Sequence, residues 1–229
     1  MLSPIPPHFF NWTFNYRRIS DIHSSKSGDL RFIPYSLNRE LKGKYEDEEN
    51  LENFHGINIT GKSIMVAWFV SNQHPEGIPR EDYVHELQKY VRVDVYGRRG
   101  NFTCPISFNF ESAACDRILK QNYLFYLSFE NSICPEYVTE KLFRPLRAGA
   151  VPIVMGGAHY SQYAPPHSYI KALDYKSPKE LADYLIQLER NRKLYAHYFE
   201  WRKYFKVDSR SFDSWCQQIG RAHVWTPVT

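Results

Sequence analysis

A group of polar side chains lies where a parallel α/β sheet would present a ligand. Residues Phe125 to Gly157 read FYLSFENSICPEYVTEKLFRPLRAGAVPIVMGG. This pattern predicts a buried strand, a polar turn, an amphipathic helix and a second buried strand, which form a βαβ unit. Ligands of such units bind beyond the carboxyl ends of the strands, so Glu130, Asn131 and the first helical turn form the candidate site.

The predicted helix has two different sides. Val138, Leu142 and Leu146 follow one another at intervals of four and form a stripe that can pack on the sheet. The opposite side carries polar or charged residues: Tyr137, Glu140, Lys141 and Arg144. A helix N-terminus carries a partial positive charge, to which the lysine adds a full one, so a diphosphate would suit the site. By spacing alone, a solvated charged face is the commoner explanation.

Local signals also predict where other helices begin and end. Pro145 should kink the helix described above or end its first segment, and Gly149 should stop it. Farther along the chain, Ser177 should cap a helix over 178–190, and an aromatic helix is expected over 195–204.

A second cation, Arg80, opens a predicted helix that follows Pro79 and ends at Val91. An enzyme that activates a phosphate donor with a metal would normally show Asp-x-Asp at a strand end, and the sequence contains no such triplet. We therefore expect no metal site. Side chains and a helix dipole would then neutralise the charge of a leaving phosphate.

Several strings in the chain resemble a known family. FENSxxxxYxTEKLxRxLxAGxVPxxxGG is similar to the signature of the α1,3-fucosyltransferases, which are inverting enzymes that use GDP-fucose and have two Rossmann-like domains. NWTFNYRR, VAWFVSN, DVYG and YFEWRK occur in the family's order. GGAHYSQYAPPHSYI resembles the branch that fucosylates the innermost GlcNAc of N-glycans.

The resemblance implies an α/β fold, a Rossmann-like parallel sheet that forms the C-terminal donor-binding domain of a GT-B glycosyltransferase. Alternating strands and helices independently favour a parallel sheet covered on both faces. We expect four parts: the end of an acceptor domain with interdomain loops (1–61), the GDP-fucose-binding domain (62–207), a C-terminal extension (208–218) and a non-native tail (219–229). The tail, IGRAHVWTPVT, resembles a translated sequencing adaptor.

The implied reaction moves fucose from GDP-β-L-fucose to the 3-hydroxyl of a GlcNAc on glycoprotein N-glycans, without metal or cofactor. The resemblance assigns catalytic roles to Arg80, Glu140 and Lys141. It assigns GDP-fucose binding to a larger set: Arg80, Tyr126, Glu130, Asn131, Tyr137, Glu140 and Lys141. The family's general-base carboxylate belongs to the acceptor domain, so we expect this chain to be a fragment that lacks the base.

Two alternatives stay open, namely a sugar-nucleotide-binding remnant without catalysis and a Lewis-type enzyme that acts on N-acetyllactosamine. A third class, an unrelated phosphate-binding α/β enzyme, would need a glycine-rich loop such as GxxxxGK[ST] or GxGxxG, and the sequence contains neither. The net charge of +4 is spread along the chain, so nothing indicates a nucleic-acid partner.

The family resemblance also implies a location. These enzymes are type II membrane proteins of the Golgi with a lumenal catalytic part, so the membrane anchor would precede this sequence. No segment approaches the roughly 18 apolar residues that a bilayer requires. The four cysteines, Cys104, Cys115, Cys134 and Cys216, allow two disulfides in three pairings. Asn-x-Thr triplets make three asparagines candidates for glycosylation: Asn11, Asn58 and Asn101.

Overall fold

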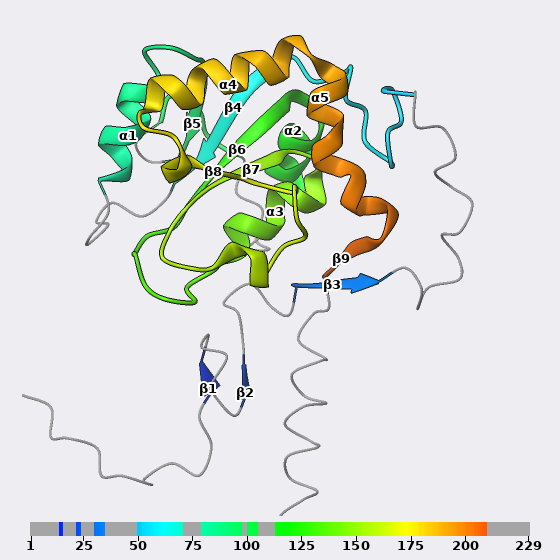
Figure 1. The fold of residues 1–229 in the computed structure, drawn as a ribbon. Helices are drawn as coiled ribbons and strands as arrows, with labels where there is room; N and C mark the ends of the chain where they lie inside the picture. Colours follow the sequence, from blue (N-terminus) through cyan, green and yellow to red (C-terminus); the bar gives the residue numbers. More distant parts are fainter. Residues whose placement is uncertain are drawn as a thin grey trace, which may run out of the picture.

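The centre of the structure is a five-stranded parallel sheet (Figure 1). In this computed structural model, residues 14–15, 22–23, 30–34, 50–70, 79–97, 100–104 and 113–209 are described. Across the sheet the strands are β5 (Val93–Tyr96), β4 (Ile64–Phe69), β6 (Tyr123–Phe129), β7 (Val151–Met155) and β8 (Ile170–Lys171). All neighbouring strands run parallel. The predicted α/β class is confirmed.

The strand order locates the ligand-binding end of the sheet. The chain runs from β4 outward to β5, then returns across β4 to β6 and continues to β7 and β8. The direction of winding therefore reverses between β4 and β6. Open α/β sheets bind ligands at such a reversal, beyond the carboxyl ends of the two strands. Here these ends are Phe69 and Phe129.

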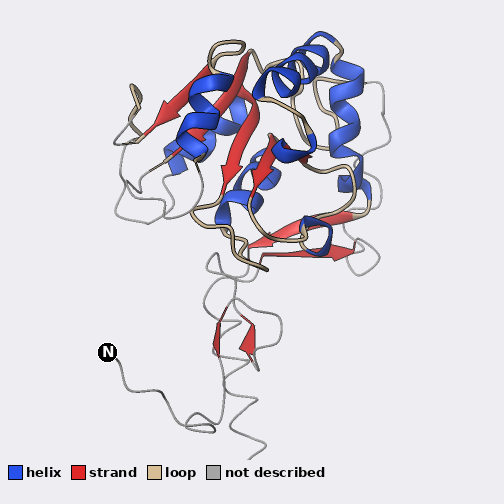
Figure 2. Ribbon diagram, turned by 60° about the vertical axis from the view of Figure 1, so that its left-hand side comes forward, coloured by secondary structure: helices blue, strands red, loops and turns tan. Residues whose placement is uncertain are grey.

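Helices cover both faces of the sheet (Figure 2). Helices α1 (Arg80–Leu87), α4 (Pro178–Arg190) and α5 (Arg192–Ala196) pack on one face and share its apolar core. Helices α2 (Ala113–Asn122) and α3 (Glu140–Ala148) cover the other. Every residue of β6 and β7 is buried, as a parallel sheet between two helical layers requires.

Short elements complete the described fold. The 3₁₀ helices are η3 (Tyr160–Gln162), η4 (Ala172–Asp174) and η5 (His197–Lys203). Strand β3 (Leu30–Pro34) pairs antiparallel with β9 (Phe205–Ser209), and β1 (Phe14–Asn15) pairs parallel with β2 (Ile22–His23). The β3–β9 ladder joins the segment predicted as the end of an acceptor domain to the end of the predicted donor domain. The four-part division of the chain stays a prediction.

Three predicted helices have different boundaries. Helix α1 ends at Leu87, whereas the sequence suggested Val91. The single aromatic helix expected over 195–204 is instead the end of α5 followed by η5. Helix α3 begins at Glu140, because Thr139 has an extended backbone and its side chain accepts the N–H of Lys141 as an N-cap.

Helix α3 ends where the sequence predicted. Gly149 has a φ of 75°, and its N–H donates to the carbonyl oxygen of Pro145. Few residues other than glycine adopt this conformation, which explains the stop. We expected Pro145 to kink the helix or to end its first segment, but α3 runs unbroken through it to Ala148.

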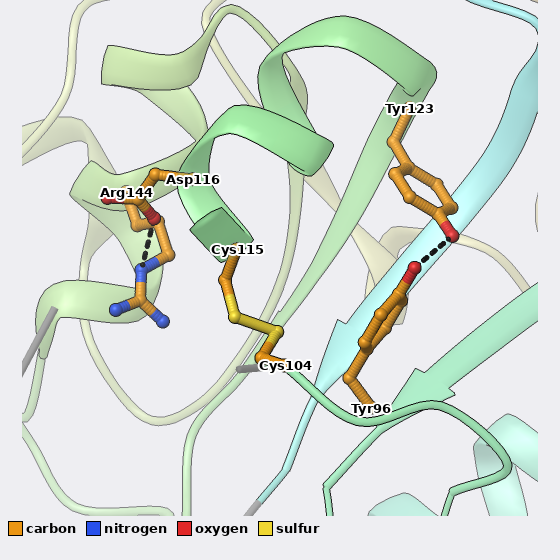
Figure 3. The surroundings of a disulfide bond; sticks show 6 residues. All are labelled: Tyr96, Cys104, Cys115, Asp116, Tyr123 and Arg144. Atoms are coloured by element: carbon orange, nitrogen blue, oxygen red, sulfur yellow. Dashed lines mark hydrogen bonds and ion pairs between the residues drawn. A yellow bond between two sulfur atoms is a disulfide. The ribbon is translucent and has the colours of Figure 1, made fainter. Parts of the chain in front are cut away.

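One disulfide lies in the described part of the chain (Figure 3). It joins Cys104, which follows β5, to Cys115 in α2. Cys134 forms no disulfide with a described residue, and Cys216 lies outside the described residues. The sequence left the pairing open, and the structure pairs Cys104 with Cys115.

Polar pairs hold the same region together (Figure 3). Asp116 of α2 forms an ion pair with Arg144 of α3 at 3.1 Å. The hydroxyls of Tyr96 and Tyr123 lie 2.9 Å apart. The Tyr123 hydroxyl also donates to a buried carboxylate oxygen of Asp94 at 2.7 Å. The ion pair joins α2 to α3, and the tyrosine and aspartate contacts join β5 to β6.

Two cations cap the carboxyl ends of α2 and α3. The Nζ of Lys62 donates to the carbonyl oxygens of Leu119, Lys120 and Tyr123 at 3.3, 2.6 and 3.0 Å. Burial lowers the pKa of Lys62 to about 7, and the nearby positive charge of Arg202 adds to this effect. Arg202 donates to the carbonyl oxygens of Leu146 and Arg147, at the end of α3. The last carbonyl groups of an α-helix have no N–H partner within the helix, so they need donors from elsewhere.

Candidate functional site

Glu130 connects the end of β6 to the start of α3. Its side chain is 1% exposed, and its N–H continues the sheet by donating to the carbonyl oxygen of Met155. The carboxylate accepts the N–H and hydroxyl of Thr139 at 2.8 to 3.0 Å. It also accepts the Nζ of Lys141 at 3.0 Å. The carboxylate thus holds the first turn of α3 in place.

The protonation of Glu130 depends on opposing effects. Burial raises the pKa of its carboxyl, because a charge is poorly solvated inside the protein. The ammonium of Lys141 and the hydrogen bonds from Thr139 act in the other direction and favour the carboxylate. The Lys141–Glu130 ion pair is therefore the contact that allows a charged carboxylate at this depth.

Asn131 brings together the two cations that the sequence singled out. Its Oδ1 accepts the Nη1 of Arg80 at 2.6 Å and the Nζ of Lys141 at 3.3 Å. The arginine comes from α1 and the lysine from α3, on opposite faces of the sheet. They meet at the carboxyl end of β6, beside the reversal of strand order. A neutral amide oxygen shared by two cations leaves positive charge available for an anion.

Arg80 is buried but keeps a free donor. The residue is 1% exposed, its Nε lies 3.4 Å from an oxygen of Glu81, and its guanidinium lies 5.6 Å from the ring centre of Trp68. Among the described residues its Nη2 has no hydrogen-bond partner. Buried guanidinium N–H groups are nearly always paired, so this atom has a hydrogen bond left to donate.

Three of the predicted site residues lie apart from this cluster. Tyr126 lies inside β6, 1% exposed, with its ring 5.2 Å from that of Phe69, and burial raises its pKa to about 12. Glu140 is the first residue of α3 and is partly exposed. Tyr137 precedes the helix, so it does not share a helical stripe with Glu140 as the sequence suggested. Contacts of these three with nucleotide or fucose stay predictions.

Two residues that were not among the predicted site residues also shape the site. Thr139 caps α3 and binds Glu130, and a threonine before Glu-Lys-Leu is a recognisable helix start. Gly156 follows β7, where a Cβ would lie 2.5 Å from the Tyr160 hydroxyl and 3.2 Å from Cγ of Glu130. A side chain at this position would collide with the tyrosine hydroxyl and crowd the Glu130 side chain. The glycine pair after the strand was the available signal.

The other described features do not add to the site. A cavity of about 490 Å³ between Pro165, Tyr184 and Trp201 is lined by none of the predicted site residues. Within the described ranges, no group of His, Cys, Asp or Glu side chains is arranged to hold a metal ion. In the same part of the chain, no helix combines the length and the apolar character that a membrane crossing needs.

Comparison with known proteins identifies similar chains. Residues 59–224 match the model described as glycosyltransferase family 10 (fucosyltransferase) C-term, and the match includes 219–224 of the predicted tail. Glycoprotein 3-alpha-L-fucosyltransferase A of Drosophila melanogaster is 40% identical over 95% of this chain and 40% of its own length. The bovine 3-galactosyl-N-acetylglucosaminide 4-alpha-L-fucosyltransferase FUT3 is 39% identical over 93% of this chain and 52% of its length.

The chain spans about half, or less, of the curated relatives it matches. Two solved structures share its fold. One, an alpha1,3-fucosyltransferase with GDP-fucose, has a TM-score of 0.54 at 19% identity and covers 73% of this chain and 49% of its own. The other, an alpha1,3-fucosyltransferase with GDP, has a TM-score of 0.50 at 24% identity, and the match covers 61% of this chain and 38% of that structure's chain. With most of its length matching the family model, this chain belongs to glycosyltransferase family 10, the fucosyltransferases, and represents their C-terminal part.

Proposed function

We propose that this chain is the donor-binding part of an α1,3-fucosyltransferase that moves fucose from GDP-β-L-fucose to the 3-hydroxyl of a GlcNAc on N-glycans. Its relatives are named as fucosyltransferases, and two structures with its fold are described with GDP and with GDP-fucose. The observation that carries the proposal is the convergence of Arg80 and Lys141 on one oxygen of Asn131.

This arrangement suits an inverting transfer. The acceptor hydroxyl oxygen forms a bond to C1 of fucose, the bond from C1 to the β-phosphate oxygen breaks, and GDP leaves with the electron pair. The acceptor proton passes to a base. Arg80 and Lys141 would neutralise the charge that develops on GDP, and the buried surroundings strengthen that effect. The base would come from the part of the relatives that this chain does not span.

Two observations support a lumenal location, which we propose to be the Golgi, with membrane attachment through a segment outside this sequence. The disulfide between Cys104 and Cys115 is typical of oxidising compartments. Asn58 and Asn101 are exposed and accessible to glycosylation, while Asn11 lies outside the described residues.

Calorimetry with GDP tests the donor assignment. Arg80→Ala and Lys141→Ala should each weaken GDP binding by about 1.5 to 3 kcal/mol, the usual value of a charge-assisted hydrogen bond. Lys179→Ala is the control, because Lys179 pairs with Asp183 on the exposed side of α4. GDP affinity that stays unchanged in both site variants would overturn the assignment.

The acceptor needs a separate experiment. The insect relative is named for glycoproteins, but the bovine relative, at almost the same identity, is named for a galactosyl-N-acetylglucosaminide. We therefore keep Lewis-type transfer as the second candidate. The chain, joined to the N-terminal half of a close relative, should fucosylate an N-glycan core in preference to N-acetyllactosamine. No transfer to either acceptor would favour a binding remnant.

A further inference from the structure

Ser128 forms an unusual contact between the central strand and the helix that carries Lys141. Its hydroxyl donates to the carbonyl oxygen of Lys141 at 2.6 Å. Ser128 lies on β6 and is 1% exposed. Carbonyl groups inside an α-helix normally accept the N–H four residues later, so this carbonyl would not ordinarily need a side-chain donor.

The need for the donor comes from Pro145. This residue lies four positions after Lys141, inside α3. Proline has no N–H, and its ring crowds the carbonyl four residues earlier. The carbonyl of Lys141 therefore loses its helical partner, and the Ser128 hydroxyl takes that place. This substitution also explains how α3 continues through a proline that the sequence suggested would interrupt it.

The same strand face controls both ends of Lys141. Ser128 and Glu130 are separated by one residue, so their side chains project to the same side of β6, where α3 lies. Ser128 binds the main-chain carbonyl of Lys141, and Glu130 binds its ammonium at 3.0 Å. The lysine is thus fixed to the strand at its backbone and at its charged end.

We propose that Ser128 is a positioning residue for Lys141, and that its hydroxyl is required because Pro145 removes the helical donor. The hydroxyl replaces the missing N–H and ties the first turn of α3 to the strand that also presents Asn131. The ammonium of Lys141 thereby stays within reach of the oxygen that Arg80 shares. The functional consequence rests on the proposed donor site; the positioning itself does not.

The test compares four proteins: the wild type, Ser128→Ala, Pro145→Ala and the double variant. Alanine at 145 restores an N–H that can reach the carbonyl of Lys141. Ser128→Ala should raise the rate at which acetic anhydride labels Lys141, measured by mass spectrometry, roughly threefold or more, because the first turn opens more often. It should also weaken GDP binding roughly five- to tenfold. In the double variant, the labelling rate of Lys141 and the GDP affinity should both lie within about twofold of the values for Pro145→Ala.

Ser168→Ala is the matched control. Ser168 is also 1% exposed, and its hydroxyl donates to the carbonyl oxygen of Pro165 at 2.7 Å, outside the site. This variant should lower the melting temperature but leave Lys141 labelling and GDP affinity unchanged. Equal labelling changes in Ser128→Ala and Ser168→Ala would reduce Ser128 to a general structural role and overturn the proposal.

The remaining outcomes are also decisive. Unchanged Lys141 labelling in Ser128→Ala would overturn the proposal, and so would an equal effect of that change in the Pro145→Ala background. If wild-type protein does not bind GDP, the proposed function fails, while the labelling comparison still decides the positioning role. If Ser128→Ala does not fold, Ser128→Cys replaces it, since a thiol is a weaker donor and should give a smaller change in the same direction.

Discussion

The Nζ of Lys141 lies 3.0 Å from Oε2 of Glu130, a carboxylate with a side chain only 1% exposed. The two partners differ in exposure, because the lysine is 14% exposed and the glutamate is almost fully buried. Glu130 therefore acts on the lysine and on the cap of α3. A direct contact of Glu130 with GDP-fucose, which the family resemblance implies, stays a prediction.

Replacing Lys141 by methionine should destabilise the fold in a pH-dependent way. The Glu130 carboxylate would stay buried without its counter-charge. The free energy of unfolding should therefore fall by about 3 to 5 kcal/mol near pH 7.5. Burial already raises the pKa of this carboxyl, and loss of the ammonium raises it further. A raised folded-state pKa favours folding at low pH, so the loss should shrink as pH falls towards about 5. Urea unfolding at both pH values measures the loss of unfolding free energy, and Lys179→Met is the control. A larger loss at the lower pH would contradict the prediction.

Changing Asn131 to aspartate should move stability and binding in opposite directions. The side chain keeps its shape but places a negative charge between two cations, so stability should stay equal or rise. GDP affinity should fall about tenfold or more, because the new carboxylate competes with the diphosphate for Arg80 and Lys141. Asn191→Asp, at the N-cap of α5, is the matched control in calorimetry. Tighter GDP binding by Asn131→Asp would be incompatible with the proposed site.

Removal of divalent metal ions should not affect donor binding. Arg80 and Lys141 supply the positive charge next to the proposed diphosphate position. EDTA should therefore leave GDP affinity within about twofold. Calorimetry with and without added manganese checks this, and a loss of binding that manganese restores would argue against the two side chains as the main counter-charges.

Lys62 should make stability rise with pH above neutrality. Burial lowers its folded-state pKa to about 7 from its ordinary value of 10.5. Between these values the unfolded chain binds more protons than the folded one, so the free energy of unfolding increases as pH rises. Lys62→Met should flatten this slope and also cost stability, because three carbonyls lose their donor. Denaturation between pH 7 and 10 measures how the free energy of unfolding changes with pH. Replacement of the exposed Lys193 by methionine is the control. An unchanged pH dependence in Lys62→Met would refute the lowered pKa of Lys62.

Gly156→Ala should disturb the site through Tyr160. The added Cβ would lie 2.5 Å from the tyrosine hydroxyl. We expect the free energy of unfolding, measured by thermal denaturation, to fall by about 1 to 3 kcal/mol. Tyr160→Phe removes the clashing oxygen and should recover part of that loss. Gly61→Ala is the control, because its Cβ would first meet the exposed side chain of Asn58, at 2.8 Å. No recovery in the double variant would mean that the clash lies elsewhere.

Local sequence determined much of this protein. Apolar runs of the right length predicted β6 and β7. Gly149 predicted the end of α3, and Ser177 with Pro178 predicted the start of α4. These features depend on backbone preferences and on burial, which neighbouring residues largely decide. The positions of Glu130 and Asn131 at a strand end were predictable for the same reason.

Tertiary structure decided what each polar residue does. The sequence could not show that Arg80 and Lys141, from helices on opposite faces of the sheet, share one amide oxygen. Nor could it show that Glu130 points inward, or that Ser128 replaces the N–H that Pro145 lacks. These contacts join residues far apart along the chain or on different elements, and they depend on strand order and on the packing of α3 against β6. Local preference carries no information about either.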